Sequence, residues 1–211
     1  MKGFLSVAKD VKNEIIIEKS RFITSLKRVY GEDDAKAFVQ EIKGKYPDAT
    51  HNCYAYIADE GGFFAKFSDD GEPQGTAGLP MLETIKAKSL KQVAVVVTRY
   101  FGGVKLGTGG LARAYADCVK KAVEKAGVKN VVWSTTFKTE VSYTIYPKIV
   151  KIIEGLEGAV LNLEYLSNGV EITFCSPLEN SAKVTEKIVD YSLGKAEVLT
   201  LSEGYCEYDL I

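Results

Sequence analysis

The chain has 211 residues and a net charge of −1, with 46% hydrophobic and 26% charged residues. This composition is typical of a folded globular protein and excludes an intrinsically disordered chain. No stretch reaches the roughly 20 apolar residues of a membrane-spanning helix, and the apolar run Phe4–Ala8 is shorter than a signal-peptide core of roughly 7–15 residues, so a cytoplasmic protein without membrane contact is expected.

The first part of the chain alternates between strand and helix patterns. Short β-rich segments predict strands, whereas apolar residues at spacings of three and four predict helices. Pro47 is expected to end the first helix. The predicted strands of this part are 14–18, 22–29, 52–58, 62–67 and 93–98, and the predicted helices are 32–46, 81–89 and 109–126.

The second part has a simpler pattern. Strands are predicted at 137–146, 160–166, 170–175 and 196–201, and helices at 147–156 and 178–193. Asn168-Gly169 is a strong hairpin signal between two of these strands. The order β-α-β-β-α-β is that of a ferredoxin-like domain. We therefore predict an α+β protein of two domains, residues 1–134 and 135–211.

The charges are distributed unevenly between the two parts. Residues 1–136 hold 21 Lys and Arg against 16 Asp and Glu, whereas residues 137–211 hold 6 against 12. A basic first part is compatible with an anionic partner, although an ordinary solvated surface explains a mild excess equally well.

The strongest local feature is the segment Arg99–Tyr115, which reads as a strand end, a glycine-rich loop and a helix start. The first N–H groups of a helix lack intrahelical partners and, with the helix dipole, form a site for anions. Glycine lets a ligand approach the backbone closely. The alternative is that these glycines only permit tight turns and close packing. The candidate anion-binding residues here are Arg99, Lys105, Thr108, Gly109, Gly110 and Arg113.

Two named nucleotide motifs do not fit this segment. Residues 107–112 match G-x-G-x-x-A, but a long loop separates them from the preceding strand, and the next strand does not end in an acid. A Walker A loop is excluded because Thr108 stands where that motif needs lysine.

A second glycine-rich segment, Asp69–Pro80, carries the carboxylates of Asp69, Asp70 and Glu72. Such a group is able to hold Mg²⁺ or to act in acid–base catalysis. The favoured interpretation is an acidic turn in which Asp69 and Asp70 cap backbone N–H groups. His51, the single histidine, is more often structural than catalytic in such a position.

The cysteines do not form a metal-binding pattern. They are scattered along the chain and include no C-x-x-C pair. A zinc site is therefore not expected, and the cysteines are expected to be free thiols. No metal or other cofactor is predicted. The cysteines are Cys53, Cys118, Cys175 and Cys206.

Several of these segments together resemble the YigZ/Impact family, which is linked to translation control. The matching stretches are Glu18–Phe22, Ala49–Cys53, Ser68–Pro80 and Thr98–Tyr115. The last two are long and specific, and the resemblance covers roughly residues 14–127. It also implies that Arg21 and His51 belong to the functional surface.

The resemblance implies a fold for each domain. The first domain would have the fold of ribosomal protein S5 domain 2, and the second would be ferredoxin-like, similar to an elongation-factor end domain. Eukaryotic Impact proteins act in a stress-kinase pathway through an extra N-terminal module. This chain starts close to the shared domain, so that pathway role is not expected here.

Three hypotheses for function follow. The first is a non-enzymatic factor that binds RNA or the translation apparatus, with Arg21, Arg99, Lys105 and Arg113 contacting phosphates. The second is a protein–protein adaptor that uses the same surface. The third is an enzyme acting on a phosphorylated small molecule, with the acidic segment and His51 supplying the chemistry. Binding is favoured over catalysis.

Overall fold

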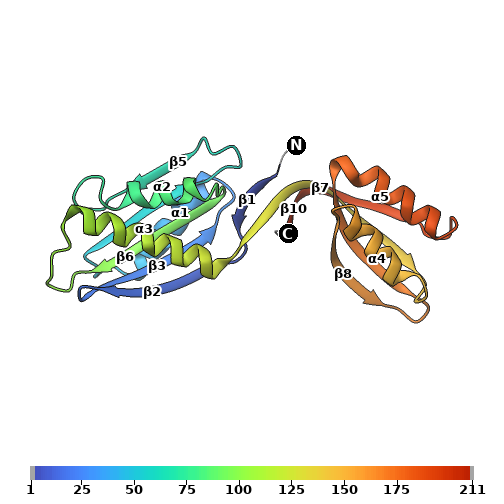
Figure 1. Ribbon diagram of the computed structural model, residues 1–211, viewed down its shortest axis with the longest axis horizontal. Helices are drawn as coiled ribbons and strands as arrows, with labels where there is room; N and C mark the ends of the chain where they lie inside the picture. The colour runs from blue at the N-terminus through green and yellow to red at the C-terminus, as the bar shows by residue number, and fades with distance from the viewer. Residues whose placement is uncertain (1–2, 210–211) are drawn as a thin grey trace. The chain divides into compact units, whose positions relative to one another are not determined.

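A computed structural model describes residues 3–209 of the chain. Its contacts divide the chain into two compact units, apart from the chain ends (Figure 1). The first unit is Phe4–Asn130 and the second is Val131–Tyr208. The helices and strands of both units confirm the predicted α+β class. Within residues 3–209, no helix is long and apolar enough to cross a membrane.

The first unit is built on a five-stranded sheet in which every neighbouring pair is antiparallel. The turn between its first two strands is tight, because Glu18 and Lys19 both have positive φ angles, 44° and 63°. The strands lie in the order β2 (Val11–Ile17), β3 (Ser20–Arg28), β6 (Val93–Tyr100), β4 (His51–Ile57) and β5 (Ala65–Ser68), and β1 (Phe4–Val7) precedes them.

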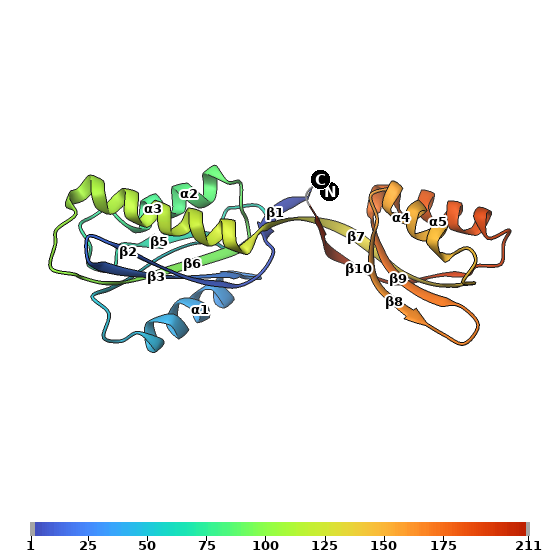
Figure 2. The same cartoon turned by 60° about the horizontal axis from the view of Figure 1, so that its bottom comes forward.

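Helices cover both faces of this sheet (Figure 2). On one face α1 (Glu32–Lys45) packs against alternate residues such as Ala94 and Val96. On the other face α2 (Gly78–Ala87) and α3 (Gly107–Ala126) pack against Val95 and Val97. Because successive strand residues point to opposite faces, β6 serves both layers, which explains its unbroken run of β-branched residues.

The second unit has its helices on one face of an antiparallel sheet. Its elements are β7 (Val128–Val141), α4 (Tyr146–Gly155), β8 (Ala159–Tyr165), β9 (Val170–Pro177), α5 (Leu178–Tyr191) and β10 (Val198–Asp209). The strands lie in the order β8-β9-β7-β10. Ile149 of α4 and Ile188 of α5 pack against Ile172 and Phe174 of β9.

The opposite face of this second sheet carries a row of like charges. Glu140 of β7 pairs in register with Glu171 of β9, which pairs in turn with Glu164 of β8. The pairing places the three glutamates side by side on the face that alternates with the buried residues. Lys138 Nζ contacts Glu171 Oε2 at 2.8 Å.

The predicted boundaries differ from the structure at several elements, and β1 is not among the predicted strands. Helix α2 begins at Gly78 instead of at residue 81, β7 begins at Val128 instead of at residue 137, and β10 continues to Asp209 instead of ending at residue 201. The two strands are longer because pairing with neighbouring strands, which local alternation does not report, extends them.

Candidate functional site

A buried polar cluster joins the two glycine-rich segments at the Glu72 carboxylate. Arg99 Nη1 donates to Glu72 Oε1 at 2.6 Å, and the Tyr115 hydroxyl donates to the same oxygen at 2.8 Å. Glu72 is 8% exposed and Arg99 is 4% exposed. Burial raises the pKa of Tyr115, so its hydroxyl keeps the proton that it donates. The cluster holds the loop against the sheet.

His51 forms the outer edge of this cluster. It is paired in register with Arg99 across β4 and β6. Its Nδ1 lies 2.8 Å from the backbone carbonyl of Asp70, and because a carbonyl only accepts, Nδ1 carries a proton. The other ring nitrogen, Nε2, lies 3.8 Å from Glu72 Oε2. The contact with the carbonyl therefore orients the ring, and Nε2 faces the Glu72 carboxylate from beyond hydrogen-bond distance.

Asp69 organises the second glycine-rich segment as a cap. Its carboxylate accepts hydrogen bonds from the backbone N–H groups of Gly75, Ala77 and Gly78 at 2.8, 3.0 and 2.8 Å. These N–H groups belong to the loop and to the start of α2, and they would otherwise lack hydrogen-bond acceptors. Asp69 therefore caps backbone N–H groups of the loop, which is the role expected for it in an acidic turn.

Asp70 links the same loop to α1. Its carboxylate accepts from Lys43 Nζ at 2.6 Å and from the backbone N–H of Asn52 at 2.6 Å. Burial raises the pKa of Asp70, but these hydrogen bonds outweigh it and the net pKa lies below the ordinary value of 3.8.

Because the folded-state pKa of Asp70 is lowered, the stabilisation from this carboxylate is complete above about pH 4 and is lost as the pH falls further. We expect wild type to be more stable than Asp70→Asn at pH 6, with a difference that shrinks steadily below pH 3.8. Urea unfolding at several pH values measures this difference. A constant difference from pH 6 to pH 2.5 would contradict the assignment.

Cys53 is an internal packing residue of the cluster. Its thiol donates to the backbone carbonyl of Asp69 at 2.9 Å and lies 3.4 Å from the Tyr115 hydroxyl. Burial raises the pKa of Cys53 to about 12, so the thiolate that nucleophilic catalysis needs is not formed near neutral pH. All four cysteines are free.

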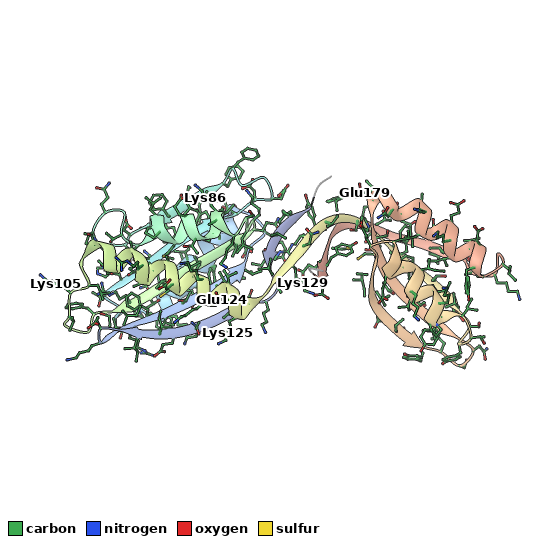
Figure 3. The ribbon with its side chains drawn as sticks, in the orientation of Figure 1. Lys86, Lys105, Glu124, Lys125, Lys129 and Glu179 are labelled. Carbon is green, nitrogen blue, oxygen red and sulfur yellow. The ribbon has the colours of Figure 1, made fainter. Side chains whose placement is uncertain are left out.

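The glycine-rich start of α3 is anchored at its base and open at its tip. The Ser20 hydroxyl accepts from the Gly102 N–H at 3.2 Å, and the Thr50 hydroxyl accepts from the Phe101 N–H at 3.0 Å. Beyond these anchors the chain is exposed, and Lys105 extends outward from the loop before α3 (Figure 3).

The first turn of α3 presents its backbone to solvent. Thr108 and Gly109 are exposed, and a Cβ atom added at Gly107 or Gly109 would meet nothing within 4 Å. Within residues 3–209, the N–H groups of Thr108, Gly109 and Gly110 find no acceptor outside their own helix. The exposed Arg113 lies one turn further along the helix. This surface, named the α3 start below, comprises Lys105, Thr108, Gly109, Gly110 and Arg113.

The structure separates the predicted site residues into distinct groups. The α3 start is one group, and His51, Glu72 and Arg99 form the buried cluster. Arg99 is held in that cluster by a second contact as well, since its Nη2 donates to the Ser20 hydroxyl at 3.2 Å. Arg21 lies apart and forms a two-point ion pair with Glu14 at 2.8 and 2.9 Å.

Two members of the cluster could not be identified from the sequence. Tyr115 falls on the apolar stripe of its helix, so its hydroxyl gives no separate signal. Ser20 lies in the first strand hairpin, far from the other members in sequence. Among the residues that the structure describes, no group of three or more His, Cys, Asp or Glu side chains could hold a metal ion.

Several known proteins are similar in sequence to this chain. The family model described as the Impact N-terminal domain matches residues 18–123. The IMPACT family member YvyE of Bacillus subtilis (strain 168) is 39% identical over 208 residues, which cover 99% of this chain and 94% of the relative. The IMPACT family member YigZ of Escherichia coli (strain K12) is 34% identical over 205 residues, which cover 96% of this chain and 100% of the relative.

A more distant relative and a solved structure are also similar to this chain. The Protein IMPACT homolog of Dictyostelium discoideum is 35% identical over 94 residues, which cover 43% of this chain and 27% of the relative. A solved structure described as "Crystal structure of an hypothetical protein" matches with a TM-score of 0.60 and 33% identity, over 96% of this chain and 98% of that chain.

Proposed function

Because the chain belongs to the IMPACT family, we propose that it is a non-enzymatic factor linked to translation, which binds RNA or the translation apparatus through its first unit. The resemblance to the eukaryotic Impact proteins supports the link to translation. The observation that carries the binding proposal is the α3 start, where the first backbone N–H groups of a helix lie at an exposed surface that also carries Lys105 and Arg113.

The architecture of the two units is compatible with this proposal. We propose that the first unit has the fold of ribosomal protein S5 domain 2 and the second a ferredoxin-like fold. The order β-α-β-β-α-β and the strand order β8-β9-β7-β10 support the second assignment. Domain limits at residues 1–134 and 135–211 belong to the same proposal. A fold alone does not determine what a protein binds, so the proposal depends on the α3 start.

Binding of a fluorescein-labelled 20-nucleotide single-stranded RNA, followed by fluorescence anisotropy, tests the proposal. Arg113→Ala is expected to weaken binding about tenfold, because it removes one phosphate contact. It is also expected to reduce the slope of log affinity against log salt by about 0.7. Lys121→Ala is the matched control, since Lys121 is an exposed cation further along α3, and it should bind like wild type.

Two results would count against RNA binding at this surface. One is an affinity that does not change between 50 and 200 mM KCl, because phosphate contacts release counterions and must respond to salt. The other is an equal loss of affinity in Arg113→Ala and Lys121→Ala, which would indicate only a general effect of net charge.

The adaptor alternative is favoured by exposed aromatic side chains at the β4–β5 hairpin. Phe63, Phe64 and Phe67 are 87%, 58% and 43% exposed, and exposed aromatic groups are enriched where proteins bind one another. A partner that is recovered equally well after nuclease treatment, and is lost in Phe63→Ser, would support this alternative.

The enzyme alternative is favoured by the oriented ring of His51 beside Glu72. Histidine is the side chain that most often acts in general acid–base catalysis. The enzyme alternative would be supported over RNA binding and over the adaptor role if the protein turned over a phosphorylated small molecule and His51→Gln lost this turnover while retaining binding.

A further inference from the structure

A small pocket lies on the α1 face of the first unit, where α1 meets β4 and β5. Its volume is about 220 Å³. The residues that line it come from these three elements and are Lys36, Val39, Gln40, Lys43, Tyr54, Tyr56, Lys66 and Ser68. The α3 start and the buried cluster belong to the opposite face of the sheet, so this pocket is separate from the site described above.

The lining of the pocket is cationic. Lys36, Lys43 and Lys66 contribute three ammonium groups, and none of the lining residues is acidic. The carboxylates that neutralise these lysines lie outside the lining. Lys36 Nζ contacts Glu32 Oε1 at 3.2 Å, and Lys66 contacts the same oxygen.

These carboxylates fix the ammonium groups without using all of their donors. Lys43 Nζ lies 2.6 Å from Asp70 Oδ1, and an ammonium group has three N–H donors. Each lysine is thus held in position and retains donors for a further acceptor. Groups that are held before a ligand arrives lose less conformational entropy when it binds.

Aromatic rings form the remaining wall of the pocket. The rings of Tyr54 and Tyr56 stack with centroids 6.0 Å apart and an angle of 10° between their planes. Val39 adds an apolar side chain, and Gln40 and Ser68 add polar groups. Tyr56 is only 2% exposed, so the half-buried ring of Tyr54 is the aromatic surface that the pocket offers beside its cationic groups.

We infer that this pocket binds a small organic phosphate, a phosphomonoester whose organic part is a single flat ring. A phosphate group carries three strong acceptor oxygens and up to two negative charges, which matches three ammonium groups better than one carboxylate would. The volume is below the roughly 300–1,000 Å³ of pockets for drug-sized ligands, so the ligand is small.

The pocket is connected to the loop that carries Glu72. Asp70 holds Lys43 with one carboxylate oxygen and the Asn52 N–H with the other, and its φ of 46° is unusual for a residue other than glycine. A phosphate that takes a second donor of Lys43 brings its negative charge close to the Asp70 carboxylate, which accepts from the same ammonium group. Ligand binding should therefore be detected at the Asn52 amide, although Asn52 does not line the pocket.

Phenyl phosphate is a suitable probe, with phenol and inorganic phosphate as its separate parts. In titrations of the full chain followed by NMR, phenyl phosphate should bind at least tenfold more tightly than either part, and the Asn52 amide signal should shift. Lys43→Met and Lys66→Met should each weaken binding about tenfold, because each removes a charged hydrogen-bond donor. Lys45→Met, at an exposed position of α1 outside the pocket, should bind like wild type.

Tyr54→Leu provides a second variant that keeps all three lysines. It should weaken phenyl phosphate while leaving inorganic phosphate unchanged. The inference is overturned if Lys45→Met weakens binding as much as Lys43→Met, or if inorganic phosphate binds as tightly as phenyl phosphate. It is also overturned if the shifts concentrate at Gly109 and Gly110, because the phosphate would then bind at the α3 start. Arg113→Ala leaves this pocket intact, so the RNA proposal and this inference fail independently.

Discussion

Replacement of Glu72 by alanine is expected to lower the free energy of unfolding of the first unit by about 3–5 kcal/mol. The variant leaves the Arg99 guanidinium buried without its carboxylate and leaves the Tyr115 hydroxyl without its acceptor. A buried charge that loses its partner costs far more than the pair itself contributes, because its desolvation is no longer offset.

A matched control is available in the ion pair between Arg21 and Glu14. Its geometry is equally good, at 2.8 and 2.9 Å, but the two side chains are 49% and 42% exposed. Glu14→Ala should therefore cost much less than Glu72→Ala. Equal costs for Glu72→Ala and Glu14→Ala would show that burial does not determine the strength of this contact.

Native-state hydrogen exchange at Val95 and Val97 is the appropriate measurement, because both residues lie in the centre of the sheet of the first unit. The fluorescence of Trp133, the only tryptophan, reports on the second unit and serves as an internal reference. Two units that unfold separately would not give one transition, so probes specific to each unit are needed.

Replacement of Gly102 by alanine is expected to cost about 3 kcal/mol, at the upper end of the range for overpacked positions. A Cβ atom at this position would lie 2.0 Å from the carbonyl oxygen of Lys19 and 2.5 Å from the backbone N of Ser20. Both are backbone atoms of the β2–β3 hairpin, so neither can move aside as a side chain does. The hairpin or the loop before α3 has to shift.

Gly44→Ala is the control for this substitution. Gly44 lies within α1, and a Cβ atom there would meet nothing within 4 Å. Alanine should raise stability by roughly 0.5–1 kcal/mol, since glycine is the weaker helix former. Native-state hydrogen exchange at Val95 and Val97 tests both variants, and a neutral Gly102→Ala would mean that the loop is not held against the hairpin.

Local signals in the sequence were sufficient for most of the elements. The helix at Glu32–Lys45 follows from its apolar spacing and from Pro47. The hairpin between β8 and β9 follows from Asn168-Gly169. The start of α2 could not be found in the same way, because Asp69 caps Gly78 from nine residues earlier along the chain.

The candidate site was only partly predictable for a similar reason. A cationic side chain beside a glycine-rich loop reads as a phosphate contact, and Lys105 and Arg113 are exposed as that reading requires. Arg99 belongs to the same segment, yet its alternation along β6 turns it toward the buried face, where Glu72 meets it. Strand register distinguishes the buried Arg99 from the exposed Lys105 and Arg113. Register depends on contacts across the sheet, which a single sequence does not show.

The glutamate row on the second unit restricts what that unit can contact. Glu140, Glu171 and Glu164 repel one another across neighbouring strands. The ion pair between Lys138 and Glu171 relieves part of this repulsion. A nucleic-acid backbone approaching this face would increase the repulsion, whereas a lysine-rich or arginine-rich polypeptide would reduce it. The charge of this face is therefore unfavourable for contact with a nucleic-acid backbone and favourable for contact with a basic polypeptide.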